Sequence, residues 1–274
     1  MSARPPTLLL HGFTGSAEAW GAELREGLGK GTRVLAVDLP GHGARARAPE
    51  PPGSIQEALG EVVGELDAAG VERADWIGYS MGGRLALAGA ILHPDRVDRL
   101  VLESASPGLA SPEERALRRE RDEALARRIE EEGIEPFVRE WMALPLFASQ
   151  KQLPPPVLEE ARRIRLANDP AGLARALRSF GTGVQPGFWD RLGELRRPTL
   201  LLTGALDLKF EAIAGRMAEA IPEATRVSVP GVGHAPHLEA PGRWLEVVLE
   251  FLARSQCGES ELRRISEPPH QEEG

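Results

Sequence analysis

The serine at position 80 lies between two glycines, in the pentapeptide Gly78-Tyr79-Ser80-Met81-Gly82. A mostly apolar run precedes this pentapeptide and a helical pattern of small residues follows it, which predicts a strand, a tight turn and a helix. The two glycines leave room for a strained turn that lifts the serine hydroxyl above the end of the strand. The pattern predicts a reactive serine, with the first N–H groups of the following helix directed at any anion formed beside it.

A reactive serine needs a base, and His234 is the best placed of the six histidines. It follows the last strand pattern in the glycine-rich run 230–234, and open α/β sheets hold their sites at the edge where the strands end. His11 closes the first strand and is expected to shape a loop near the site. His237, three residues after the predicted base, is expected to have a supporting or structural role.

The base in turn needs an acid that orients it, and two carboxylates compete for this role. Asp207 follows the strand pattern at 199–203, which gives the chain order Ser80, Asp207, His234. Glu103 stands at the end of the preceding strand pattern and could supply the acid from there. We predict Asp207 as the acid; the other reading of either carboxylate is a helix cap or a surface charge.

A developing oxyanion needs N–H donors, and the sequence offers a natural pair. One is the backbone N–H of Met81, directly after the serine. The other is the N–H of Phe13, in the loop that follows the first strand. We therefore predict an oxyanion hole formed by Phe13 and Met81.

Short apolar strand patterns alternate with helical patterns along most of the chain. The strand runs are continuously apolar, which is typical of strands buried on both faces of a parallel sheet. We predict an α/β fold with a doubly wound, mostly parallel sheet. The predicted strands are residues 7–10, 34–37, 76–80, 99–103, 199–203 and 226–229, and the predicted helices are 55–69, 81–92, 211–220 and 243–254.

Between residues 107 and 188 the strand runs disappear. This segment is rich in arginine and glutamate and shows amphipathic helical patterns broken by prolines. About 80 residues between two strands are too many for a simple crossover. We predict a core of residues 1–106 and 189–255 with an inserted helical cap at 107–188. Residues 256–274 are polar and are expected to be disordered.

The composition is that of a globular protein of 274 residues, with 42% hydrophobic and 27% charged residues. The net charge of -8 argues against nucleic acid as a partner, and no apolar run is long enough to span a membrane. The single cysteine, Cys257, excludes an internal disulfide and a multi-cysteine metal site. Residues 1–6 lead directly into a strand, so we expect no signal peptide. We predict a cytoplasmic monomer or weak homo-oligomer that uses no metal and no cofactor.

These features together resemble the α/β-hydrolase superfamily. The resemblance rests on the serine motif, on His11-Gly12, on the segment 38–43 and on the late aspartate and histidine in that order. It covers essentially residues 7–254 apart from the predicted cap. It implies the α/β-hydrolase fold.

Further features resemble one family within this superfamily, the 2-succinyl-6-hydroxy-2,4-cyclohexadiene-1-carboxylate synthases of menaquinone biosynthesis. Arg84 lies one helical turn after the serine in an otherwise apolar helix, where a general hydrolase usually has a small or apolar residue. The remaining features are the segments 106–109, 144–147 (preceded by Trp141), 182–186 and 207–210.

The closer resemblance implies a lyase rather than a hydrolase. In that family a proton is abstracted from a cyclohexene carboxylate that carries an enolpyruvyl ether, and pyruvate is eliminated. Ser80, activated by His234, would be the base, and no acyl-enzyme would form. A substrate with several carboxylates favours fixed guanidinium groups as its contacts. The resemblance assigns substrate binding to Arg84, Arg118, Arg165, Tyr79 and Trp141.

Several of these assignments have alternatives. Most arginines of the predicted cap are expected to pair with glutamates on solvated helix faces, and Arg119, Arg121 and Arg163 are close neighbours of the two assigned cap arginines. The same triad would serve a serine carboxylesterase, thioesterase or C–C bond hydrolase, which is the alternative function. A non-catalytic binding protein is disfavoured because all three triad residues are present. Haloalkane or epoxide chemistry is disfavoured because it needs an aspartate at position 80.

Overall fold

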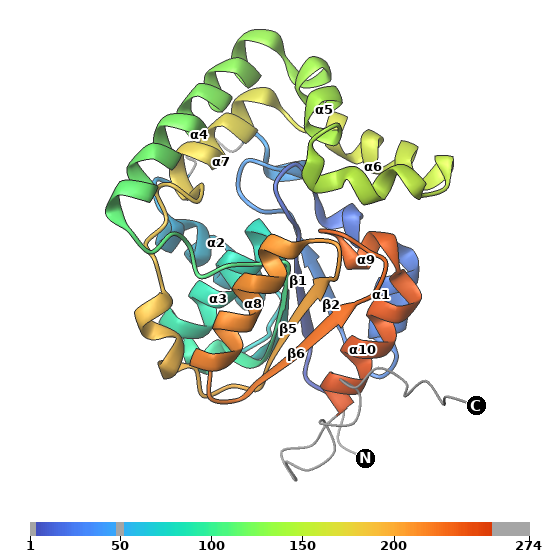
Figure 1. Ribbon diagram of the computed structural model, residues 1–274. Coiled ribbons are helices and arrows are strands. Elements are labelled where there is room, and N and C mark those ends of the chain that lie inside the picture. Colours follow the sequence, from blue (N-terminus) through green and yellow to red (C-terminus); the bar gives the residue numbers. More distant parts are fainter. Residues whose placement is uncertain (1–3, 48–51, 254–274) are drawn as a thin grey trace, which may run out of the picture.

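The computed structural model describes residues 4–47 and 52–253, and a six-stranded sheet forms its centre (Figure 1). All neighbouring strands are parallel, in the order β2-β1-β3-β4-β5-β6, which confirms the predicted parallel sheet. The strands are β1 (Thr7–Leu10), β2 (Val34–Val37), β3 (Ala74–Tyr79), β4 (Val97–Glu103), β5 (Thr199–Gly204) and β6 (Ala224–Val229). The predicted tail at 256–274 lies outside the described residues.

Helices cover both faces of the sheet and bury the apolar strand runs (Figure 1). In β1, Leu8 and Leu10 face one layer of helices, whereas Leu9 faces the other. β2 is an edge strand and is only partly buried, because just one of its sides has a neighbouring strand. The first layer contains α2 (Ile55–Ala68), α3 (Met81–Leu92) and α8 (Leu208–Ala220), and the second contains α1 (Ala22–Gly29) and α10 (Pro241–Ala253).

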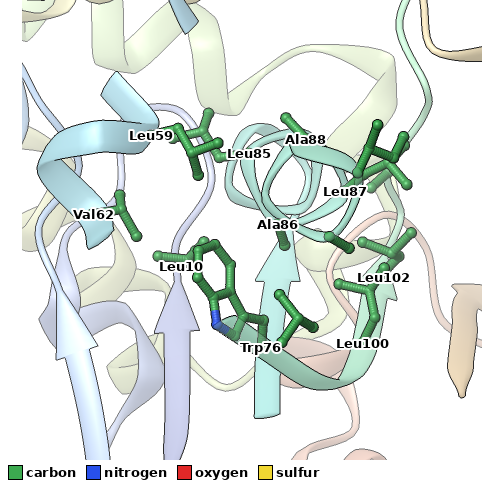
Figure 2. Close-up of a cluster of buried hydrophobic side chains, with 14 of the residues drawn as sticks. Leu10, Leu59, Val62, Trp76, Leu85, Ala86, Leu87, Ala88, Leu100 and Leu102 are labelled. Atoms are coloured by element: carbon green, nitrogen blue, oxygen red, sulfur yellow. The ribbon is translucent and has the colours of Figure 1, made fainter. Parts of the chain in front are cut away.

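Helix α3 packs directly against the strands, and its glycines make this approach possible. Figure 2 shows side chains of α3 beside Leu10, Trp76 and Leu102, which come from three different strands. A Cβ atom at Gly82 would overlap the carbonyl group of Leu10, and one at Gly89 would overlap the Trp76 ring. The start of α3 is therefore held against the end of β1.

Between β4 and β5 the described chain forms helices and no strand. They are α4 (Pro112–Glu132), α5 (Ile134–Met142), η4 (Pro145–Gln152), α6 (Pro155–Leu166), α7 (Pro170–Phe180) and η5 (Trp189–Glu194). Helices α4, α5 and α7 share an apolar cluster of their own, and α4 to α7 lie together beyond one end of the sheet (Figure 1). Four of these helices begin with proline, so the prolines mark first turns, where the missing N–H costs nothing.

Asn168, between α6 and α7, connects these helices to two loops of the sheet layer. Its side-chain amide donates to the carbonyl oxygen of Thr14 at 2.8 Å and accepts from the N–H of Gly43 at 3.1 Å. The residue is buried. Thr14 and Gly43 lie in the loops after β1 and β2, so one side chain joins three segments that are far apart in the sequence.

Two helices begin earlier than the sequence predicts, each for a local reason. α8 begins at Leu208 because the Asp207 carboxylate caps it, accepting from the N–H of Phe210 at 3.3 Å. α10 begins at Pro241, a residue type favoured in a first helical turn. The remaining short helices are η1 (Ala17–Trp20), η2 (Gly43–Arg45), η3 (Pro94–Arg96) and α9 (Pro236–Glu239). Within 4–47 and 52–253, every helix is too short or too polar to cross a membrane.

Candidate active site

Ser80 occupies a sharp turn between β3 and α3. Its backbone angles are φ 51° and ψ −107°, a conformation that costs a non-glycine residue on the order of 1–3 kcal/mol and is typical of functional sites. The Ser80 N–H donates to the carbonyl oxygen of Glu103 at 2.9 Å, which fixes the turn to the neighbouring strand. A Cβ atom at Gly78 would lie 2.5 Å from the carbonyl oxygen of Gly82. The turn thus requires a glycine at position 78, two residues before the serine.

His234 and Asp207 approach Ser80 from the loops after β6 and β5. The Nε2 atom of His234 lies 3.2 Å from Ser80 Oγ, and its Nδ1 atom lies 2.6 Å from Asp207 Oδ2. Because a carboxylate only accepts, the Nδ1–H donates to Asp207, and Nε2 is left to accept the serine proton. Both side chains are buried, which strengthens the interaction between them. This arrangement can activate the serine hydroxyl as a nucleophile or as a base.

The competing carboxylate, Glu103, contacts a different histidine. Its Oε1 accepts from the backbone N–H of His237 at 3.0 Å and from the Nδ1–H of the same residue at 2.7 Å. Its Oε2 accepts from Trp244 Nε1 at 2.9 Å, and the side chain is fully buried. The structure therefore brings Asp207 to His234 and places Glu103 in a separate buried pair.

The loop after β1 is shaped by His11. The Nε2 atom of His11 accepts from the N–H of Leu39 at 3.0 Å, and its Nδ1–H donates to the carbonyl oxygen of Gly12 at 2.8 Å. Burial lowers the pKa of His11 to about 4, so the ring is neutral at physiological pH. Phe13 lies in the turn that follows, which the N–H of Gly15 closes by donating to Gly12 at 3.0 Å.

A cavity of about 220 Å³ lies beside Ser80, between the sheet layer and the helices that follow β4. Phe13 and Met81, the two predicted oxyanion donors, both line this cavity. Met81 is the first residue of α3, where a backbone N–H has no partner within the helix. Four of the five predicted substrate-binding residues also line it: Tyr79, Arg84, Arg118 and Trp141. Arg165 is not among its lining residues.

Arg84 is a buried cation whose hydrogen-bond partners are neutral. Its guanidinium donates to the carbonyl oxygen of Phe180 at 3.0 Å and to the side-chain oxygen of Gln185. The residue is only 6% exposed. Burial, together with the nearby charge of Arg118, lowers the pKa of Arg84 to about 10, so it stays protonated at neutral pH. Arg84 therefore presents a positive charge to the cavity.

Arg118 adds a second positive charge, and Asp122 holds it in place. The Nε of Arg118 donates to Asp122 Oδ1 at 2.7 Å. The buried Asp122 also accepts from the N–H of Gly183 at 3.4 Å, and its charge raises the pKa of Arg84. Asp122 thus pairs with Arg118 and acts on Arg84 only through its nearby charge, and Lys209 lines the cavity as well. The cavity is suited to an anionic ligand.

Arg165 lies behind the wall of the cavity. Its guanidinium carbon is 6.0 Å from the ring centroid of Phe147, which lines the cavity, and it donates to the carbonyl oxygen of Ala161 at 2.7 Å. Burial lowers the pKa of Arg165, and its Nε is buried without a hydrogen-bond partner. The neighbouring Arg163 instead pairs with Glu160 on the surface at 2.7 Å. None of Arg119, Arg121 and Arg163 lines the cavity.

Comparison with known proteins places this geometry in a family. The model of the alpha/beta hydrolase family matches residues 7–247. The chain belongs to the alpha/beta hydrolase family. A protein of Bacillus subtilis (strain 168), provisionally named as a 2-succinyl-6-hydroxy-2,4-cyclohexadiene-1-carboxylate synthase, is 39% identical over 92% of this chain and 91% of its own length.

Two further alpha/beta hydrolase relatives point to the same synthases. A protein of Pectobacterium atrosepticum with the synthase name is 33% identical over 91% of this chain and 94% of its own. The solved structure of MenH from S. aureus is 35% identical and has a TM-score of 0.88, covering 92% of this chain and 94% of that one. The resemblance to this synthase family and the predicted fold are confirmed.

The sequence alone misses several side chains of this alpha/beta hydrolase site. Asp122 lies four residues after Arg118 on α4, and that spacing is the one local sign of their pairing. Gln185 has no such sign, because 101 residues separate it from Arg84. Lys209 appears in the sequence only as a neighbour of the acid, yet it lines the cavity. Across the described residues, no group of three or more His, Cys, Asp or Glu side chains is arranged to hold a metal ion.

Proposed function

We propose that this chain is a lyase that eliminates pyruvate from 2-succinyl-5-enolpyruvyl-6-hydroxy-3-cyclohexene-1-carboxylate and yields 2-succinyl-6-hydroxy-2,4-cyclohexadiene-1-carboxylate. The observation that carries the proposal is one cavity lined by both Ser80, in hydrogen-bond contact with His234, and the buried cation Arg84. This substrate carries several carboxylates, and a buried guanidinium is a natural partner for them. The synthase names of the relatives support the same assignment.

In the proposed reaction, Asp207 holds the Nδ1 proton of His234, and Nε2 takes the proton of the Ser80 hydroxyl. The Ser80 oxygen removes the ring proton beside the succinyl carbonyl. The released electron pair forms a new ring double bond, the existing ring double bond shifts, and the bond between the ring and the enolpyruvyl oxygen breaks. The enolpyruvate leaves as its enolate, and its methylene carbon takes up the proton that His234 gained, which gives pyruvate and returns the triad to its starting state. The N–H groups of Phe13 and Met81 stabilise the charge that develops on the succinyl carbonyl oxygen.

The same proposal assigns the substrate contacts and the organisation of the chain. Arg84 and Arg118 bind carboxylates, Tyr79 and Trp141 line the ring, and Arg165 is a third cation held behind the cavity wall. Residues 107–188 act as a cap that brings Arg118 and Trp141 to the cavity above the core of residues 1–106 and 189–255. We assign a cytoplasmic monomer or weak homo-oligomer with a small-molecule substrate and no nucleic-acid partner, metal or cofactor.

The decisive experiment measures pyruvate release from the enolpyruvyl cyclohexene substrate in a lactate-dehydrogenase-coupled assay, in parallel with the hydrolysis of p-nitrophenyl esters. Rapid pyruvate release with feeble ester hydrolysis is expected. The alternative is a serine carboxylesterase, thioesterase or C–C bond hydrolase, and the Ser80–His234 hydrogen bond favours it equally, because it would also activate a nucleophile. Brisk ester cleavage, no pyruvate and a covalent fluorophosphonate adduct on Ser80 would establish that alternative instead.

A further inference from the structure

The loop that carries His234 has little regular structure to hold it. It runs from the end of β6 to the start of α9, and Gly233 within it offers no side chain for packing. A Cβ atom at Gly233 would overlap the hydroxyl group of Ser149 in η4. Ala235, on the other side of the histidine, has φ −122° and ψ 68°, which belongs to neither helix nor strand. Backbone hydrogen bonds hold the carbonyl groups at the two ends of this segment, since Val232 accepts from the N–H of Leu206 and Ala235 accepts from the N–H of Glu239, both at 2.9 Å. The N–H groups of Gly233 and Ala235, directly beside the histidine, have no backbone partner among the described residues.

One carboxylate holds the backbone on both sides of His234. Glu239 Oε2 accepts from the N–H of Gly233 at 2.7 Å, and Glu239 Oε1 accepts from the N–H of Ala235 at 3.1 Å. Hydrogen bonds from N–H groups to an ionised carboxylate are stronger than those to a neutral acceptor. The two oxygens of Glu239 thus fix the residues before and after the histidine as one unit.

Glu103 fixes the chain just beyond this unit. It accepts from the backbone N–H of His237, and its side chain is fully buried in β4. Neither Glu103 nor Glu239 is among the residues that line the cavity. Glu239 contacts the histidine loop, and Glu103 contacts His237 and Trp244.

We infer that Glu239 is a positioning residue, which sets the distance between His234 and Ser80 by holding the two N–H groups that flank the imidazole. The inference rests on the proposed function, in which His234 is the base. The Nε2–Oγ distance of 3.2 Å is a hydrogen bond only while the loop keeps its place. A displacement of about 1 Å in a reacting group can cost roughly 100-fold in rate.

The first test is Glu239→Gln, assayed by pyruvate release. This variant keeps the shape of the side chain, but its NH₂ group cannot accept from an N–H, so one of the two bonds is lost. We expect kcat to fall about 10- to 100-fold with KM within about twofold, because the substrate contacts are untouched. The matched control is Glu246→Gln in α10, an exposed carboxylate that pairs with the Arg243 side chain; its kcat should stay within about twofold.

The second test needs no substrate. The Nδ1–H of His234, held 2.6 Å from Asp207, should give a downfield proton resonance, which Asp207→Asn identifies by abolishing it. Glu239→Gln is expected to broaden or shift this resonance, whereas Glu246→Gln should leave it unchanged. Should Glu239→Gln fail to fold, Glu239→Asp replaces it, because the shorter side chain keeps the charge but cannot reach both N–H groups.

The two tests separate the inference from the proposed function. An unchanged resonance and unchanged kcat in the folded Glu239 variant would overturn the inference, and so would a loss of kcat that only matches the loss of folded enzyme. A wild-type protein that releases no pyruvate would overturn the proposed function, and the resonance of the substrate-free protein would still decide whether Glu239 positions His234.

Discussion

Replacement of Arg84 by methionine tests whether a buried charge serves the substrate rather than the fold. Burial lowers the pKa of Arg84 from 12.5 to about 10, and each unit corresponds to 1.36 kcal/mol, so the folded protein holds this charge at a cost of about 3 kcal/mol. A cation with a lowered folded-state pKa destabilises the fold wherever it is charged in both states, which here means every pH below about 10. The full cost is therefore present at neutral pH.

The methionine variant removes this cost but leaves two buried acceptors unpaired. The carbonyl oxygen of Phe180 and the side-chain oxygen of Gln185 each lose the guanidinium, at about 1–3 kcal/mol per acceptor and so about 2–6 kcal/mol together. We therefore expect the free energy of unfolding of Arg84→Met to lie between a rise of about 1 kcal/mol and a fall of about 3 kcal/mol.

The catalytic effect of the same substitution is expected to be a clear loss. A charge-assisted contact to a substrate carboxylate is worth about 2–3 kcal/mol, so kcat/KM should fall about 30- to 150-fold. Urea unfolding and the pyruvate-release assay measure the two quantities on the same preparation. The control is Arg163→Met, which removes an exposed arginine paired on the surface and should change neither. A variant of Arg84 that loses several kcal/mol of stability while keeping wild-type kcat/KM would refute the reasoning.

Three further outcomes are expected. Each of the variants Ser80→Ala, His234→Ala and Asp207→Asn should lower kcat at least about 1,000-fold with little change in the free energy of unfolding. Normal pyruvate release by any of them would remove that residue from the triad. Burial lowers the pKa of His42 from 6.5 to about 3. Between these two pH values His42 binds a proton in the unfolded chain but not in the folded protein. About 3 kcal/mol of stability should be lost through this residue between pH 7 and pH 4, and urea titrations of His42→Gln should show a smaller loss than the wild type. Gly82→Ala should lower the free energy of unfolding by about 1–3 kcal/mol or more, because the new Cβ atom would overlap backbone atoms. Gly60→Ala has open space around it and should not lower the free energy of unfolding. Equal Tm values for these two variants would contradict the packing of α3.

The positions of Ser80, Asp207 and His234 could be predicted because each follows a strand. The carboxyl ends of parallel strands meet at one edge of the sheet, so side chains just after them come together whatever their separation in sequence. The position of Arg84 could also be predicted from the sequence, because it lies one helical turn after Ser80 on α3.

The choice between Asp207 and Glu103 shows where this reasoning ends. Both stand near the carboxyl ends of neighbouring strands. Glu103 is the last residue of β4 and its side chain is buried beside Trp244, whereas Asp207 lies three residues beyond β5 and reaches His234. The position of a carboxylate at a strand end does not show which histidine its side chain contacts, because that contact depends on the packing of α9 and α10.

The arginines of the helices between β4 and β5 were harder to place. Arg118 lines the cavity and Arg165 lies behind Phe147, although both stand on helices with several other arginines. Which of them faces the cavity depends on how each helix is rotated against its neighbours. That rotation is set by tertiary contacts such as Asp122 with Gly183, which the local pattern does not contain.

The hydrogen bonds of Asn168 have a mechanical consequence. Because its amide is bonded to Thr14 and to Gly43, the corner between α6 and α7 is directly linked to the loops after β1 and β2. A lift of that corner would drag the turn that contains Phe13 and misalign a proposed oxyanion donor. The ring of Phe13 also packs against Trp141 of α5, with the ring centroids 5.3 Å apart. The proposed oxyanion donor is therefore coupled to the helices that follow β4 at two separate places.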